Sequence, residues 1–126
     1  MTTILVVDDE PLIAMALEAE LVDAGYGVVT AANGRQGLER LAEAPRPELV
    51  LTDMMMPVMG GAEMIAAMVA DPELRGVTVI VLSSLPEAAV RARANGAAAI
   101  LRKPYTAEGV LSAIERVLGG AGEAAT

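Results

Sequence analysis

The sequence predicts an α/β domain in which a five-stranded parallel sheet is covered by helices on both faces. Two observations lead to this fold class. Five short apolar runs, rich in Val, Ile and Leu, alternate with five segments of helical periodicity. The strongest runs are continuously apolar, which is typical of strands that are buried on both faces. Short turns join the segments, and this alternation of strands and helices is the pattern of parallel sheets.

The first two strand–helix units have clear boundaries. Residues 4–7 form a β-branched run, and Pro11 suits the first turn of the helix that follows. Gly25 is expected to end that helix at about residue 24. Residues 27–31 then predict the second strand, and a helix over 35–44 ends at two prolines.

The remaining three units follow the same pattern. The predicted strands cover residues 48–52, 77–82 and 98–101. The predicted helices cover residues 60–69, 86–94 and 106–118. Thr106 is a suitable N-cap for the last helix, and Gly119-Gly120 is expected to stop it. We therefore predict one domain over residues 1–119 and a disordered tail over residues 120–126.

The composition excludes several classes of function. There is no cysteine and no histidine among the 126 residues, so metal binding or catalysis must use carboxylates, hydroxyls and backbone groups. The net charge of −8 argues against nucleic acid as a direct partner. No apolar run approaches the roughly 20 residues that span a bilayer, and the start lacks the features of a signal peptide. We expect a cytoplasmic domain.

Chemically useful side chains follow four of the five predicted strands. They are Asp8, Asp9, Asp53, Ser83 and Lys103, the last being the only lysine in the chain. The carboxyl ends of parallel strands meet at one edge of a sheet, where ligands bind in open α/β folds. We therefore expect these residues to lie together. The second strand carries none of them, which suits a position at the edge of the sheet.

Three converging carboxylates require a compensating positive charge. Two like charges about 4 Å apart repel by roughly 4 kcal/mol at an effective dielectric constant near 20. A hard divalent cation removes this repulsion, and a site built of oxygen ligands and water suits Mg²⁺. The sequence therefore predicts a magnesium site formed with Asp8, Asp9 and Asp53.

The same residues are suited to accepting a phosphoryl group. An aspartate can act as a nucleophile and form an aspartyl phosphate. The metal and Lys103 would neutralise charge on the transferring group, and Ser83 would donate a hydrogen bond to it. There is no glycine-rich nucleotide-binding loop, so the donor is expected to be another protein or a small phosphate ester.

Four segments together resemble the receiver domain of two-component response regulators, including its chemotaxis-type single-domain members. The segments are Val7-Asp8-Asp9-Glu10, Asp53 to Gly61, Ser83-Ser84 and Lys103-Pro104-Tyr105. The likeness extends over residues 3–118. It implies a flavodoxin-like (βα)5 fold with strand order 2-1-3-4-5, and a phosphorelay component rather than a dedicated enzyme.

The resemblance also assigns roles to individual residues. Asp53 would be the phosphoacceptor, Ser83 the switch hydroxyl and Lys103 the phosphate-binding lysine. Asp9 would bind Mg²⁺ directly, Asp8 mainly through water, and the backbone carbonyl of Met55 would be a further ligand. The donor would be a phosphohistidine on a sensor histidine kinase or on a histidine phosphotransfer protein.

The sequence departs from the family pattern at the position of the switch residue, and it has apolar residues at two positions that affect hydrolysis of the phosphoryl group. Ile100 occupies the position where the family often has an aromatic switch residue, which puts the usual inward swing of an aromatic ring in doubt. Met55 and Leu85 occupy the two positions that, in the family, flank the path of the hydrolytic water. Both are apolar, so slow self-dephosphorylation is expected.

The resemblance further implies that helix 86–94, strand 98–101 and helix 106–118 form the surface that signals to a partner, or to a second copy of the chain.

The sequence alone leaves other functions open. A Mg²⁺-dependent phosphatase with an aspartate nucleophile generally needs a second aspartate two residues later, where this chain has Met55. A flavin-binding protein of the same fold needs aromatic side chains and a phosphate-binding first loop, and visible absorbance would test for it. A receiver that acts only as a phosphorylation-independent scaffold is a further alternative. The chain would act by docking, as a relay, or as part of a longer protein.

Overall fold

The computed structural model describes the backbone of residues 2–125 and the side-chain environments of residues 2–119. Its five strands form one parallel sheet in the order β2-β1-β3-β4-β5. The strands are β1 (Thr3–Val7), β2 (Gly27–Ala31), β3 (Leu49–Asp53), β4 (Thr78–Ser83) and β5 (Ala99–Arg102). The helices are α1 (Pro11–Asp23), α2 (Gly34–Leu41), α3 (Gly61–Ala70), α4 (Glu87–Arg93) and α5 (Ala107–Ala125), with a short 3-10 helix η1 (Pro72–Leu74) after α3. The predicted fold class and strand order are confirmed.

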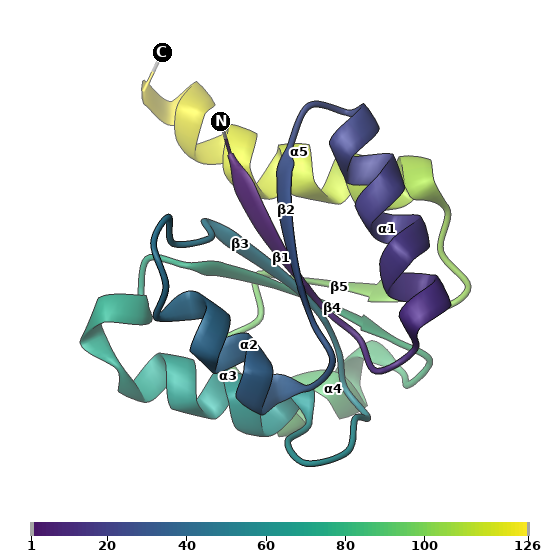
Figure 1. Cartoon of the computed structure of the whole chain (residues 1–126), viewed down its shortest axis with the longest axis vertical. Coiled ribbons are helices and arrows are strands. Elements are labelled where there is room, and N and C mark those ends of the chain that lie inside the picture. Colours follow the sequence, from purple (N-terminus) through teal and green to yellow (C-terminus); the bar gives the residue numbers. More distant parts are fainter. Residues whose placement is uncertain (1, 126) are drawn as a thin grey trace.

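The helices cover the sheet in two layers. Helices α1 and α5 lie on one face, and α2, α3 and α4 lie on the other (Figure 1). Side chains of β1 alternate between the two layers, with Ile4 and Val6 in the core beneath α1 and α5, and Leu5 and Val7 in the core beneath α2, α3 and α4. Continuous apolar runs thus form strands because both faces of the sheet are buried.

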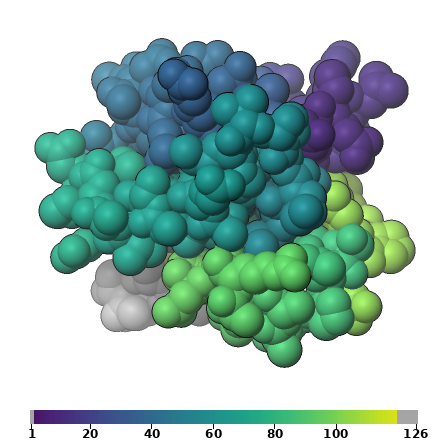
Figure 2. Space-filling view, turned by 90° about the horizontal axis from the view of Figure 1, so that it is seen from below, coloured from purple at the N-terminus to yellow at the C-terminus, as the bar shows by residue number. Residues whose placement is uncertain are grey.

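The register of the sheet brings the strand ends together. Val7 pairs with Thr52, Asp53 with Leu82, and Ser83 with Arg102. The residues that follow these pairs are therefore at the same edge of the sheet. In the space-filling view, the purple start of the chain, the teal segment near its middle and the yellow-green segment before α5 adjoin on one side of the molecule (Figure 2). Strand β2 is at the edge of the sheet, as expected, and contributes little to the site.

Local sequence signals account for most element boundaries. Gly25 follows α1 with a φ of 100°, a left-handed conformation that glycine adopts without strain. Asn33 caps α2, because its side-chain oxygen accepts a hydrogen bond from the Gln36 amide at 2.9 Å. Thr106 caps α5 in the predicted way, with its hydroxyl accepting from the Gly109 amide at 2.9 Å.

Two helix ends were predicted wrongly. Helix α2 was expected to reach residue 44, but it ends at Leu41, before the prolines that were expected to stop it. Helix α5 was expected to end at Leu118, but it continues to Ala125 across Gly119 and Gly120. Glycine weakens a helix by about 1 kcal/mol relative to alanine, and this cost does not by itself end one. The side chains of residues 120–126 lie outside the part that the structure describes, so the disordered tail stays a prediction, as does the boundary at residue 119. Among the described helices, none is long and apolar enough to cross a membrane.

Candidate functional site

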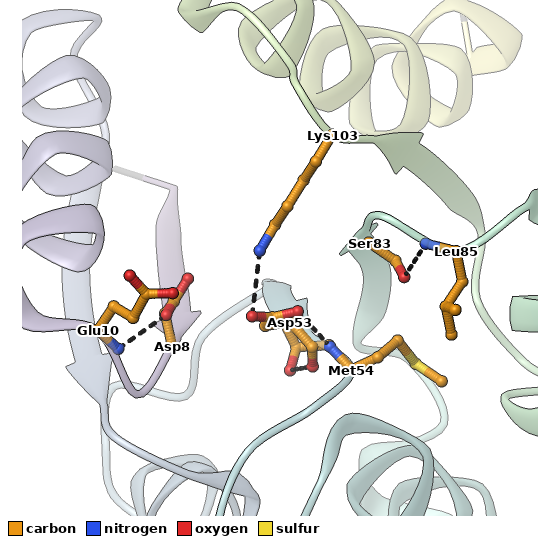
Figure 3. A network of polar contacts seen from close by, with 8 residues as sticks. Asp8, Glu10, Asp53, Met54, Ser83, Leu85 and Lys103 are labelled. Carbon is orange, nitrogen blue, oxygen red and sulfur yellow. Dashed lines mark hydrogen bonds and ion pairs between the residues drawn. The ribbon is translucent and has the colours of Figure 1, made fainter.

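Asp53 stands at the centre of the carboxyl edge of the sheet. It is the last residue of β3 and its exposed fraction is 9%. One carboxylate oxygen, Oδ2, accepts a hydrogen bond from Nζ of Lys103 at 3.1 Å, and the other, Oδ1, accepts from the Met54 amide at 2.7 Å (Figure 3). Lys103 approaches from the loop after β5, on the opposite side of Asp53 from Met54. Both oxygens are therefore held in a fixed orientation.

Three carboxylates form one acidic cluster. Oxygen atoms of Asp8, Asp9 and Asp53 all lie within 4.8 Å of one another. Asp8 is buried, with 4% of its surface exposed, and its Oδ1 accepts from the Glu10 amide at 2.9 Å, whereas Asp9 is exposed. A set of carboxylate oxygens that reaches solvent at Asp9 fits a hard divalent cation that keeps some of its water, as Mg²⁺ does. The donor set thus fits the predicted metal.

Burial and charge shift the pKa values of this cluster. Burial raises the pKa of the Asp8 carboxyl, and the neighbouring Asp53 raises it further, while the Glu10 amide and Lys103 oppose the rise. For Lys103, burial acts to lower the pKa, but the hydrogen bond and the charge of Asp53 outweigh it, so the pKa is raised. Lys103 therefore stays charged and compensates part of the repulsion among the carboxylates.

The raised pKa of Asp8 predicts that Asp8→Asn stabilises the metal-free protein. A carboxyl whose pKa is higher in the folded state contributes stability that is fully present below the unfolded pKa and is lost as pH rises through the folded value. At pH 7 the ionised Asp8 is therefore unfavourable, and asparagine keeps the oxygen that accepts from Glu10. We expect the free energy of unfolding without metal to rise at pH 7, by an amount that shrinks as pH falls toward 4.

Urea unfolding at several pH values measures this effect, with the exposed Glu39→Gln as the control. Mg²⁺ should stabilise the wild type and the control, and stabilise Asp8→Asn much less, because metal ligands must be ionised. A metal-free Asp8→Asn variant that unfolds more easily at pH 7 would contradict this account.

The loop from Met54 to Gly60 is fastened at both ends. The Gly61 amide donates to the carbonyl of Met54 at 2.9 Å, which closes the loop, and the Gly34 amide of α2 donates to the carbonyl of Met59 at 2.8 Å. A Cβ atom on Gly61 would overlap the Asp53 carbonyl oxygen, so only glycine fits there. The backbone of Met55, whose carbonyl the resemblance assigns to the metal, thus lies in a loop that is held in place.

Val58 in this loop has a strained backbone. Its φ is 67°, and the Met59 amide donates to the Pro57 carbonyl at 2.7 Å across it, which forms a γ-turn. A γ-turn with a positive φ at its central residue is rare and strained, and a β-branched residue is especially unsuited to positive φ. The Val58 side chain is 72% exposed, so packing does not offset this strain.

Val58→Asn should therefore stabilise the protein. Asparagine has no branch at Cβ and is more frequent than valine at positive φ, so we expect the free energy of unfolding to rise by about 0.5–1 kcal/mol. Val69→Asn is the matched control, because Val69 is also exposed but has helical geometry in α3. Urea unfolding of both variants gives the comparison, and equal effects would mean that the strain at Val58 is negligible.

Ser83 is turned away from Asp53. Its buried hydroxyl oxygen accepts from the Leu85 amide at 3.0 Å, on the far side of Asp53 from Asp8 (Figure 3). Ile100 is half-buried and packs against the core beneath α2, α3 and α4, as Leu85 does. Tyr105 packs on the other side, beneath α1 and α5, where burial raises the pKa of its hydroxyl.

The structure brings Asp8, Asp9, Asp53 and Lys103 together, and it holds Ser83 at the same edge without a hydrogen bond to Asp53 among the described residues. Sequence reasoning missed the Met54 amide and the role of Gly61. The signal that could have indicated a close backbone approach is the pair of adjacent glycines, Gly60-Gly61, in the loop after a strand-end aspartate.

The chain belongs to the response regulator receiver domain family, whose pattern matches residues 4–115. It is therefore a receiver domain of the kind used in two-component signalling, and such domains are generally not dedicated enzymes.

Individual relatives agree with this assignment. A probable chemotaxis protein CheY of Rhizobium etli is 34% identical over 92% of this chain and 92% of its own length. The solved structure of the chemotaxis response regulator CheY4 of Vibrio cholerae has a TM-score of 0.85 at 33% identity, covering 93% of this chain and 98% of that chain. A hybrid signal transduction histidine kinase of Dictyostelium discoideum is 31% identical over 91% of this chain, which spans only 7% of that kinase.

Proposed function

We propose that this chain is the phosphoacceptor of a cytoplasmic two-component phosphorelay, and that Asp53 takes the phosphoryl group. The donor is a phosphohistidine on a sensor histidine kinase or a histidine phosphotransfer protein. Mg²⁺ is held by Asp8, Asp9, Asp53 and the backbone carbonyl of Met55. The observation that carries the proposal is the convergence of three carboxylates within 4.8 Å, with Lys103 paired to the central one.

The arrangement of Asp53 supports nucleophilic attack. An oxygen of Asp53 attacks phosphorus, the bond from phosphorus to the histidine nitrogen breaks, and that nitrogen keeps the electron pair and takes a proton. Lys103 shifts its hydrogen bond from Asp53 to a phosphoryl oxygen, where its charge is most needed. Bound Mg²⁺ supplies the positive charge that lets an ionised carboxylate and the phosphoryl oxygens approach one another.

A groove beside the acceptor supports the docking of a protein donor. It has a volume of about 720 Å³ and is lined mainly by apolar side chains of α1 and of the segment that begins at Lys103. Leu12, at the start of α1, lines it and is largely exposed. Because Lys103 lines the same groove and contacts Asp53, a helix seated there would bring its phosphohistidine to the acceptor.

The α4-β5-α5 surface is the proposed output region. Phosphorylation gives Ser83 a new acceptor, so its hydroxyl leaves the Leu85 amide and turns toward the phosphoryl oxygens. That movement displaces the loop before α4. Because Ile100 replaces an aromatic switch residue, the change would pass through packing of aliphatic side chains such as Leu85 and Ile100. A partner protein, or a second copy of the chain, would bind the altered surface.

We predict that the isolated domain loses its phosphoryl group slowly. Met55 and Leu85 follow Asp53 and Ser83 by two residues, and neither side chain can orient a water molecule by hydrogen bonding. Replacing Leu85 with Asn should shorten the lifetime of the phosphoryl group several-fold, and replacing it with Met should not. Intact mass followed over time measures both.

Intact mass after incubation with acetyl phosphate tests the proposal. We expect a gain of one phosphoryl group with Mg²⁺ in the wild type, no gain after chelation of metal, and no gain in Asp53→Ala. Asp71→Ala is the control, because Asp71 caps η1 away from the carboxyl edge of the sheet. No gain in the wild type with either acetyl phosphate or a phosphorylated histidine protein would leave a phosphorylation-independent scaffold as the function.

A further inference from the structure

The methionines of this chain differ sharply in exposure. Met55 is 70% exposed and Met15 is 62% exposed. The others whose burial is described are buried or half-buried: Met54, Met56, Met59, Met64 and Met68. The three consecutive methionines after Asp53 therefore include one thioether that is open to solvent, Met55, between two that are not.

Met55 combines exposure with a fixed backbone. Its neighbour Met54 donates its amide to Asp53 at 2.7 Å, and the Met54 carbonyl accepts from Gly61 at 2.9 Å. Two Cα–Cα steps of 3.8 Å place the Met55 Cα no more than about 7.6 Å from that of Asp53. A chemical change in the Met55 side chain therefore occurs next to Asp53, and the hydrogen bonds of Met54 keep this part of the loop close to Asp53.

We propose that Met55 is a redox modification site that controls how long the phosphoryl group stays on Asp53. A peroxide is the oxidant. The thioether sulfur attacks one peroxide oxygen, the O–O bond breaks, and methionine sulfoxide forms as hydrogen peroxide is reduced to water. The reaction adds one oxygen atom to the side chain and changes neither its charge nor the backbone carbonyl.

The sulfoxide differs from the thioether in one relevant respect. A thioether is a very weak hydrogen-bond acceptor, whereas the S–O group is strongly polar and accepts hydrogen bonds from water. Hydrolysis of an aspartyl phosphate needs a water molecule held in line with the bond that breaks. Oxidised Met55 supplies an acceptor for that water at a position where the thioether supplies almost none, so oxidation shortens the lifetime of the signal. This consequence depends on the proposed phosphorylation of Asp53, whereas selective oxidation does not.

Dilute hydrogen peroxide provides the test, with three proteins: wild type, Met55→Leu and Met15→Leu. Peptide mass spectrometry should show a gain of one oxygen at Met55 and Met15 well before the buried methionines. After phosphorylation by acetyl phosphate and removal of the donor, each protein is compared with itself before and after peroxide. We expect a several-fold shorter phosphoryl lifetime in wild type and Met15→Leu, no change in Met55→Leu, and recovery after treatment with methionine sulfoxide reductase.

Each result other than this one overturns the inference in an identifiable way. Oxidation of the half-buried methionines at the same rate as Met55 would remove its selectivity. Selective oxidation with an unchanged lifetime would overturn the inference alone and leave Asp53 as the acceptor. A wild type that takes no phosphoryl group before peroxide would overturn the proposed function, and the control of its lifetime with it.

Discussion

Lys103→Met should slow phosphoryl uptake from acetyl phosphate by about 100-fold or more, the usual effect of removing one donor that stabilises charge in a transition state. Lys103 is the only lysine in the chain, and its Nζ lies 3.1 Å from Asp53 Oδ2. No other cation is hydrogen-bonded to Asp53 among the described residues. The time course of intact mass measures the loss.

The same variant should bind Mg²⁺ more tightly than the wild type. The positive charge of Lys103 repels an incoming cation, and its hydrogen bond to Asp53 occupies a carboxylate oxygen that the metal can use. Removing Lys103 therefore leaves the three carboxylates more available. Isothermal titration calorimetry measures the affinity. A variant that had merely lost its fold would show weaker binding, so the two measurements together separate a direct role from damage.

Arg102→Met is the matched control for Lys103→Met. Arg102 precedes Lys103, carries the same charge and is exposed. Its replacement should change neither phosphoryl uptake nor Mg²⁺ affinity by more than a small factor. Equal losses in the two variants would mean that only net positive charge near this edge matters, and would contradict the specific pairing of Lys103 with Asp53.

The parts of the fold and site that the sequence predicted are those determined by local chemistry. The continuous apolar run of β1, the proline that starts α1 and the glycine that follows it each act within a few residues. The meeting of Asp8, Asp53 and Lys103 followed from one general rule, that parallel strands end at the same edge of the sheet. Neither these local signals nor that rule depends on the details of side-chain packing.

Other features could not be predicted because they depend on contacts between distant segments. The Gly34 amide reaches the carbonyl of Met59 only because α2 and α3 pack side by side. The positive φ of Val58 contradicts its own conformational preference and is imposed by the hydrogen bonds on either side of it. The orientation of the Ser83 hydroxyl toward Leu85 is likewise a property of the folded loop.

Gly61→Ala should both destabilise the protein and weaken its affinity for Mg²⁺. A Cβ atom at residue 61 would overlap the Asp53 carbonyl oxygen and lie 3.2 Å from the Met54 Cα. Both are backbone atoms, and the Asp53 carbonyl already accepts from the Thr52 hydroxyl at 2.8 Å, so no side-chain rotation relieves the overlap. We expect a loss of about 1–3 kcal/mol in the free energy of unfolding, as for other overpacked sites.

The effect of Gly61→Ala on the affinity for Mg²⁺ distinguishes a positioning role of Gly61 from simple overpacking. Relief of the overlap requires the loop to move away from β3, which breaks the hydrogen bond from Gly61 to Met54 and shifts the carbonyl of Met55, the proposed metal ligand. Gly76→Ala is the control, because a Cβ there meets nothing within 4 Å. Urea unfolding and Mg²⁺ titration of both variants provide the comparison. If Gly61→Ala unfolds more easily but binds Mg²⁺ as tightly as Gly76→Ala does, the loop after Asp53 does not hold a metal ligand in place.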